Sequence, residues 1–186
     1  GTGILAIGSG ATLNLKSHVQ QGNAGWTVAA GATIEFANTG LTWQISDGHN
    51  QANAELVMTG TANAGDTPTV IPSTTGGTHI TIRTAAGGTN ARFIDGSFIR
   101  GGRVRATYVD HVRIGDGTNA AYTFWPSAAD TFSWTFCTLD SACGRLQNTV
   151  VTGNSTTVRV EDCRFNATGQ NISPTLATVA ITTGTR

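Results

Sequence analysis

The densest group of charged side chains lies between Arg92 and Asp116. Arginines beside aspartates suit an acidic sugar: a basic group removes the proton next to a uronate carboxylate, while aspartates hold a calcium ion. If the chain is a polysaccharide lyase, we expect the following residues to carry this chemistry: Asp95, Arg103, Asp110, Arg113 and Asp116. The same stretch also fits a solvated outer face with ion pairs, which is the interpretation that we favour.

Aromatic side chains offer a second kind of site, because flat apolar ring faces suit contact with sugar rings. Tyr122 and Trp125 lie in a turn-like insertion and are the candidates for an exposed ligand contact. An aromatic side chain tucked under its own loop fits that pattern equally well. We expect Trp26 and Trp134 to pack in the core instead.

The three cysteines, Cys137, Cys143 and Cys163, are too few for a disulfide scaffold and show no zinc-type spacing. We expect Cys137 and Cys163 to be stacked, buried thiols, with Cys143 either free or paired with Cys137 across a short loop. A nucleophilic cysteine needs a histidine, and alternation along the strand should turn His111 away from the cysteine face. The sequence thus predicts no metal and no cofactor.

Charge and composition limit the partners of the chain. Eleven basic residues balance eleven acidic ones, so no excess positive field attracts a nucleic acid backbone. No apolar run approaches the ~20 residues that a membrane span needs. Charged residues make up only 12% of the chain, and its 24 glycines go with abundant threonine, which favours tightly turned β structure.

An internal repeat indicates which elements must hold these side chains. Residues 5–15 read apolar-x-apolar, a Gly-Ala bend and apolar-x-apolar, and residues 26–36 repeat this pattern about 21 positions later. A second set, residues 107–114, 132–139 and 158–165, recurs at about 25 to 26 positions. Aligning this set predicts three apolar columns: Val109, Trp134 and Val160; Val112, Cys137 and Cys163; and Ile114, Leu139 and Phe165.

Alternating strands of this kind bury one face each, but a single coil of about 21–26 residues cannot enclose a core alone. Stacked coils can, because neighbouring backbones pair and the apolar columns merge into one interior. We therefore predict an all-β fold, a right-handed parallel β-helix, over residues 1–186 as a single domain. A β-sandwich of short strands is the alternative, and it gives no reason for in-register columns.

Over residues 107–165, and more weakly over 4–36, the sequence resembles the right-handed parallel β-helix (pectate-lyase-like) superfamily, whose coils follow a valine-x-valine-x-x-cysteine-x-phenylalanine pattern. The related hydrolases carry Asn-Thr-Asp, Asp-Asp, Gly-His-Gly and Arg-Ile-Lys motifs. This chain departs from all four, with only the fragments Arg113-Ile114-Gly115 and Gly48-His49-Asn50. The departure argues against a hydrolase of that group and leaves a lyase open.

Neither end shows an obvious cap, since the coil pattern starts at Ile4 and still runs at Ile181. The chain also begins with Gly1, so we expect a mature or excised segment whose partners are flanking coils or a second copy stacked head-to-tail. We predict an extracellular or cell-surface structural or adhesive solenoid, such as a filament subunit, and favour this structural role over an enzymatic one. The alternatives are a polysaccharide lyase and a phage tail-fibre or tailspike segment that binds surface polysaccharide.

Overall fold

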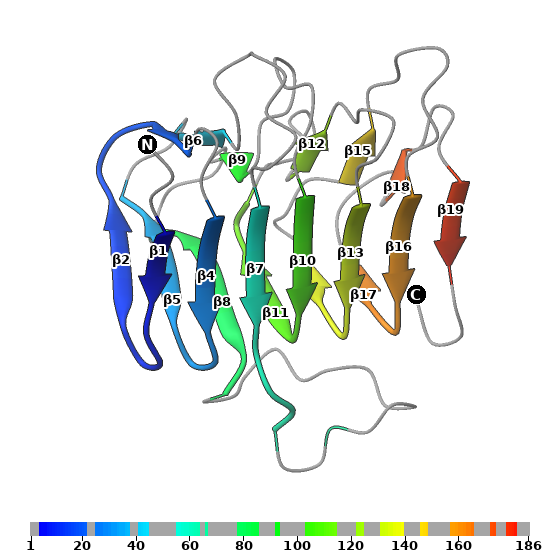
Figure 1. Cartoon of the computed structure of the whole chain (residues 1–186), viewed down its shortest axis with the longest axis horizontal. Coiled ribbons are helices and arrows are strands. Elements are labelled where there is room, and N and C mark those ends of the chain that lie inside the picture. The colour runs from blue at the N-terminus through cyan, green and yellow to red at the C-terminus, as the bar shows by residue number, and fades with distance from the viewer. Residues whose placement is uncertain are drawn as a thin grey trace.

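The computed structural model describes residues 4–21, 25–37, 41–44, 55–63, 66, 78–85, 92–93, 103–114, 122–124, 131–139, 146–148, 157–165, 172–173 and 178–181. Every regular element in these ranges is a β-strand, and none is a helix (Figure 1). Every strand pair is parallel. The predicted all-β class is confirmed.

The strands form four sheets. The seven-stranded sheet has the order β1 (Ile4–Ile7), β4 (Gly25–Ala29), β7 (Glu55–Thr59), β10 (Arg103–Thr107), β13 (Thr131–Thr135), β16 (Thr157–Glu161) and β19 (Thr178–Ile181). The six-stranded sheet has the order β17 (Arg164–Phe165), β14 (Thr138–Leu139), β11 (Val109–Val112), β8 (Ile80–Thr84), β5 (Thr33–Phe36) and β2 (Thr12–Leu15). Two three-stranded sheets contain β3 (Val19–Gln20), β6 (Thr42–Gln44) and β9 (Arg92–Phe93), and β12 (Tyr122–Phe124), β15 (Leu146–Asn148) and β18 (Ile172–Ser173).

Hydrogen-bonded neighbours within a sheet are separated in the sequence by strands of other sheets, as parallel pairing requires. The first predicted repeat is confirmed, since Leu5 lies opposite Trp26 and Leu13 opposite Ile34. In-register residues on neighbouring strands, called a column below, therefore run from β1 into β4 and from β2 into β5.

The alignment of residues 132–139 with 158–165 is also confirmed, because Trp134 lies opposite Val160 and Leu139 opposite Phe165. The alignment of residues 107–114 is wrong by three positions. Ala106, not Val109, lies opposite Trp134, and His111, not Ile114, lies opposite Leu139.

The error arises at the turn between the two large sheets. The chain turns at Tyr108 and at Phe136, and both residues have a positive φ, 50° and 52°. Asp162 takes the same conformation, with a φ of 48°, at the next such turn. Matching these turn residues gives a shift of 28 positions from Tyr108 to Phe136. The predicted shift of 25 positions also places apolar residues, Val109, Val112 and Ile114, in line with other apolar residues, so the sequence pattern did not distinguish the two.

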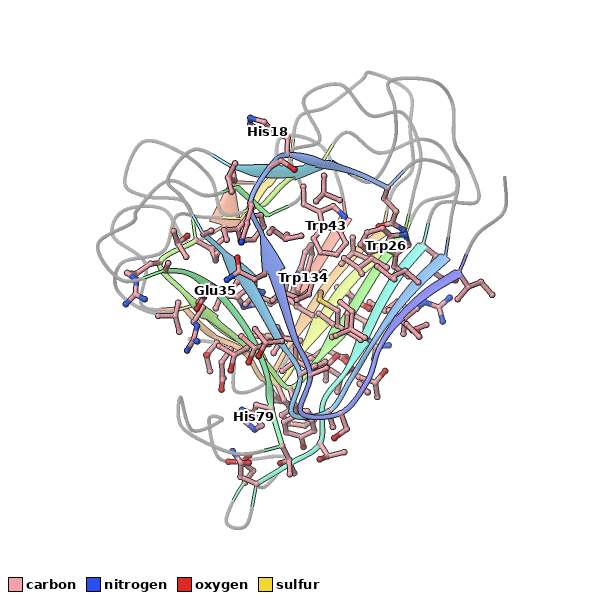
Figure 2. All side chains as sticks on the ribbon, turned by 90° about the vertical axis from the view of Figure 1, so that its left-hand side faces the viewer. His18, Trp26, Glu35, Trp43, His79 and Trp134 are labelled. Atoms are coloured by element: carbon pink, nitrogen blue, oxygen red, sulfur yellow. The ribbon has the colours of Figure 1, made fainter. Side chains whose placement is uncertain are left out.

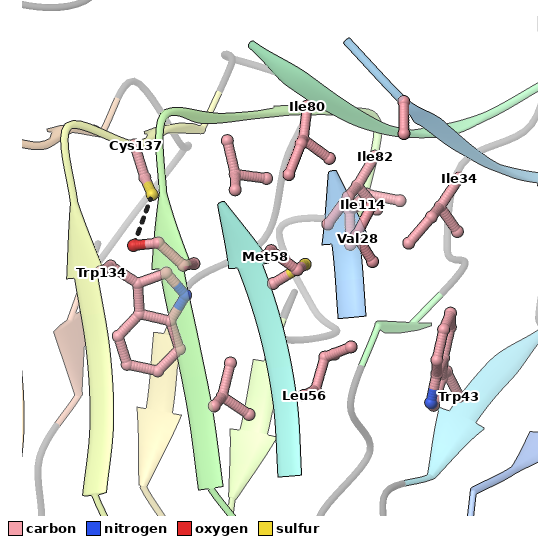
Figure 3. Packing of buried hydrophobic residues seen from close by; sticks show 14 of the residues in the cluster. Val28, Ile34, Trp43, Leu56, Met58, Ile80, Ile82, Ile114, Trp134 and Cys137 are labelled. Atoms are coloured by element: carbon pink, nitrogen blue, oxygen red, sulfur yellow. Dashed lines mark hydrogen bonds between the residues drawn. The ribbon is translucent and has the colours of Figure 1, made fainter. Parts of the chain in front are cut away.

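Apolar side chains from the two large sheets meet between them (Figure 3). One column of the seven-stranded sheet is buried along six consecutive strands: Ile7, Val28, Met58, Ala106, Trp134 and Val160. Ile34, Ile80 and Ile82 of the six-stranded sheet are fully buried. Burying this apolar surface is the main favourable term that holds the sheets together.

Candidate functional site

The structure describes only some of the residues predicted to bind or act on a ligand. Asp95, Asp116 and Trp125, like Cys143, lie outside the described residues. Arg103 is the first residue of β10 and Tyr122 the first residue of β12. Their roles therefore stay predictions.

Arg113 and Asp110 are described, and both make contacts within the protein. The Arg113 guanidinium donates from Nη2 and Nε to the Thr84 carbonyl, at 2.8 and 3.2 Å, and the Thr84 hydroxyl donates to the Arg113 carbonyl at 2.7 Å. Asp110 is only 3% exposed and contacts His79 and Thr138. These contacts join Arg113 to the end of β8 and Asp110 to the neighbouring strand β14.

The cluster around Asp110 is the most concentrated group of buried polar side chains in the described residues. His79 Nδ1 lies 3.0 Å from Asp110 Oδ2, and His79 Nε2 lies 2.8 Å from Asp66 Oδ2. The side chain of His79 is fully buried, and those of Asp66 and Asp110 are 6% and 4% exposed. One imidazole therefore bridges two buried carboxylates.

Neighbouring strands bring these groups together. Asp110 lies on β11, between β8 and β14, and pairs in register with Thr138, whose hydroxyl donates to Asp110 Oδ1 at 2.8 Å. His79 immediately precedes β8. Figure 2 shows His79 close to the corner where the two large sheets meet.

Asp66 comes from the connection between β7 and β8, residues 60–79, called the β7–β8 connection below. Asn63 N–H donates to Asp66 Oδ2 at 2.8 Å, and Asp66 N–H donates to the Asn63 carbonyl at 3.0 Å. The two ends of the connection also meet, since Thr61 N–H donates to the Thr78 carbonyl at 3.2 Å. The Thr78 hydroxyl lies 2.9 Å from the Thr61 carbonyl.

Aromatic rings flank the cluster along the corner. Tyr108 lies with its ring centroid 5.4 Å from that of His79 and stacks on Phe136 at 4.8 Å, with an angle of 10° between the planes. Burial, together with the nearby charges of Asp66 and Asp162, raises the pKa of Tyr108 above its usual 10.0. Its phenol therefore keeps its proton at neutral pH.

The two contacts of His79 set a proton requirement. A neutral imidazole has one N–H, so its second nitrogen presents a lone pair. Two favourable contacts with carboxylate oxygens need either an imidazolium or a proton on one carboxyl group. Burial raises the pKa of Asp110 above 3.8, although hydrogen bonds from Thr138 and His79 and the His79 charge oppose the shift.

This arrangement does not suit nucleophilic catalysis. In a histidine relay one ring nitrogen faces the nucleophile and the other an orienting carboxylate. Here both nitrogens face carboxylates. Within the described ranges, no group of three or more His, Cys, Asp or Glu side chains is placed to hold a metal ion.

The cysteines have a packing role. Cys137 and Cys163 are free, fully buried thiols in the hydrophobic core, as predicted, and the Cys137 N–H donates to Cys163 Sγ at 3.4 Å. Burial raises the pKa of the Cys137 thiol well above its usual value. A thiol that keeps its proton is a poor nucleophile.

The prediction that His111 points away from the cysteine face is wrong. His111 is fully buried, its Nδ1 donates to the Thr138 carbonyl at 2.7 Å, and it lies opposite the buried Ile82. The physical reason is the register error of three positions. An odd shift moves every side chain of a strand to the opposite face of the sheet.

His79 and Asp66 were not among the residues predicted from the sequence to form a site. His79 stands next to an apolar strand, and its partners are 13 and 31 positions away in the sequence. Only the correct register of β8 and β11, together with the path of the β7–β8 connection, brings them together.

In the part of the chain that the structure describes, no helix has the length and hydropathy for crossing a membrane. No family model, no curated protein and no solved structure matches the chain.

Proposed function

We propose that the chain is a right-handed parallel β-helix that serves outside the cell as a structural or adhesive element. The observation that carries the proposal is the buried column from Ile7 to Val160, which continues in register through six strands of one sheet. The chain passes through the two large sheets in a repeating order, and its described strands pair only in parallel. Both features support the proposal of successive coils. Crossovers between parallel strands are right-handed in nearly all proteins.

The chemistry of the described polar groups supports a structural role over a catalytic one. His79 uses both ring nitrogens on buried carboxylates, and Arg113 uses its guanidinium on a backbone carbonyl. Cys137 is a buried thiol. Each of these groups thus stabilises the fold through contacts within the chain.

The edge of the seven-stranded sheet at β1 supports assembly. Ile4 is 80% exposed and Leu5 is 38% exposed, and β1 is the first strand of its sheet. An edge strand presents unpaired N–H and C=O groups to another strand. We expect this edge to receive a further coil, either from a second copy or from flanking coils.

The opposite edge of the same sheet suits the first of these partners. Val179 and Ile181 of β19 stand in the columns that begin at Leu5 and Ile7. β19 of one copy beside β1 of the next therefore places apolar residues in line with apolar residues, in a non-closing head-to-tail contact. After β17, no described strand is added to the six-stranded sheet, whereas β19 is added to the seven-stranded sheet. A junction made by the described strands therefore pairs strands on one sheet only, and we expect it to be weak.

An edge variant tests the assembly. We expect the weight-average mass of the unmodified chain to rise with concentration in sedimentation experiments, with short filaments visible by electron microscopy. Ile4→Lys combined with Leu5→Lys should leave monomers, because lysines on an edge strand oppose strand pairing. Thr27→Lys, at an exposed position of the interior strand β4, is the matched control and should assemble like the unmodified chain.

Two results would contradict the assembly. One is an unmodified chain that stays monomeric at every concentration. The other is a trimer that forms regardless of the edge lysines, which would favour a tail-fibre or tailspike segment instead.

A further inference from the structure

The last strand of the seven-stranded sheet, β19, closely matches the first strand, β1. β19 reads Thr-Val-Ala-Ile and β1 reads Ile-Leu-Ala-Ile. Both strands occupy the same columns of the sheet. In both cases a glycine stands three positions after the final isoleucine, Gly10 after Ile7 and Gly184 after Ile181. β19 therefore resembles the strand with which a second copy begins its sheet.

The two ends of the described sheets also correspond to each other. β1, β2 and β3 follow one another in the chain, and each is the end strand of its own sheet. β16, β17 and β18 follow one another in the same way, and β17 and β18 are end strands, whereas β16 is covered by β19. Figure 1 shows β1 and β2 at one end of the described strands and β17 and β19 at the other. Among the described strands, β19 alone prevents these two sets from meeting sheet by sheet.

Building on the proposed assembly, we infer that β19 is a self-capping strand. In the free chain β19 covers the edge of β16, and on assembly β1 of a second copy takes its place. β17 and β18 then face β2 and β3 of the second copy. The junction between copies therefore pairs strands on three sheets.

On the seven-stranded sheet this exchange replaces like with like. β19 pairs with β16 over four residues, with Val179 opposite Val158 and Ile181 opposite Val160. β1 is also four residues long, and it brings a leucine and an isoleucine to the positions of Val179 and Ile181. Strand pairing and apolar contacts on this sheet are therefore nearly conserved.

The gain comes from the other sheets. Phe165 of β17 stands in the column that begins at Leu13 of β2. β2 of the second copy thus brings Leu13 in line with Phe165, and its backbone groups pair with those of the β17 edge. β3 stands in the same relation to β18. The exchanged junction should therefore be stronger than a junction through β19, which pairs strands on one sheet only.

Competition by β19 regulates the assembly. Only a chain whose β19 has left β16 can accept a second copy, so the apparent affinity between copies is reduced by the fraction of such chains. Weakening β19 should therefore promote assembly. A junction that uses β19 itself predicts the opposite, because weakening β19 would then remove part of the contact.

Val179→Lys tests this difference in sign. It places a charge in an apolar column of β19 and weakens pairing with β16. In sedimentation experiments we expect half-assembly at about a tenfold lower concentration than for the unmodified chain, the factor for losing the burial of about one valine. Thr178→Lys is the matched control, because it carries the same charge at the neighbouring position, on the other face of the strand. It should assemble like the unmodified chain.

A chemical bridge tests the exchange from the other side. Arg159→Cys and Ala180→Cys lie in register on β16 and β19, so a short bismaleimide can tie the two strands together in a chain with Cys143→Ser. The bridged chain should stay monomeric at concentrations where the unbridged one assembles. A bridge between Arg105→Cys and Ser133→Cys, on the interior strands β10 and β13, should leave assembly unchanged. Near-UV circular dichroism checks that each variant is folded.

The outcomes separate the exchange from the assembly on which it rests. If the unmodified chain assembles but Val179→Lys needs an equal or higher concentration, the exchange is overturned and head-to-tail assembly stands. Undiminished assembly of the chain bridged between β16 and β19 would overturn the exchange in the same way. If no variant and no unmodified chain assembles at any concentration, the proposed assembly itself is contradicted.

Discussion

Replacing Trp134 with alanine is expected to lower the free energy of unfolding by about 3–5 kcal/mol, the usual range for removing a fully buried large aromatic side chain. Trp134 has no exposed surface and is among the largest buried side chains. Its neighbours in the column are Ala106 and Val160, both smaller than tryptophan. Neither can fill the cavity, so little of the loss is recovered. Urea denaturation followed by far-UV circular dichroism measures the change.

Ser133→Ala is the control for this experiment, because Ser133 precedes Trp134 on β13 and lies half-buried on the other face of the strand. We expect it to change the free energy of unfolding by less than about 0.5 kcal/mol. A Trp134→Ala variant as stable as the control would show that the column is not packed in the core as described.

Gly60→Ala has the second large expected effect, a loss of about 1–3 kcal/mol from forced backbone displacement. A Cβ atom on Gly60 would lie 2.4 Å from the Tyr108 carbonyl oxygen and 3.0 Å from that of Thr107. Both are backbone atoms, and Gly60 N–H donates to the Thr107 carbonyl at 2.8 Å. The turn therefore cannot open without losing a hydrogen bond. Thermal and urea unfolding both report the loss.

Gly25→Ala is the matched control, because a Cβ atom there meets nothing within 4 Å. Gly25 lies on β4, where alanine restricts the unfolded chain and should stabilise the protein by about 0.4–1 kcal/mol. The two glycine variants should thus change stability in opposite directions. Equal effects at Gly60 and Gly25 would contradict the close approach of the turn to Tyr108.

The sequence predicted the strands better than their register. Leu5 and Trp26 could be aligned because the Gly-Ala bend marks the same turn in both repeats. Residues 107–114 could not, because Val109, Val112 and Ile114 are spaced so that two registers look alike. Tyr108 and Phe136 mark the true register only through their positive φ angles, which ordinary residues do not reveal in a sequence.

The candidate site depended on that register. Asp110 was singled out for its charge, but the error of three positions placed its neighbour His111 on the wrong face. His79 and Asp66 were missed because a residue within or beside a long connection has no periodic pattern to place it. Contacts across 13 and 31 positions follow from the fold and not from local spacing.

We propose that successive coils stack in parallel and in register, and spin-label distances along one outward column of the seven-stranded sheet test this proposal. Labels at Ala6 and in turn at Arg105, Ser133 or Arg159, in a chain with Cys143 replaced by serine, span three, four and five strand steps. We expect backbone separations of about 14, 19 and 24 Å, rising by about 4.8 Å per strand. Separations that fail to rise in even steps, or that place Arg159 closer to Ala6 than Arg105, would contradict it.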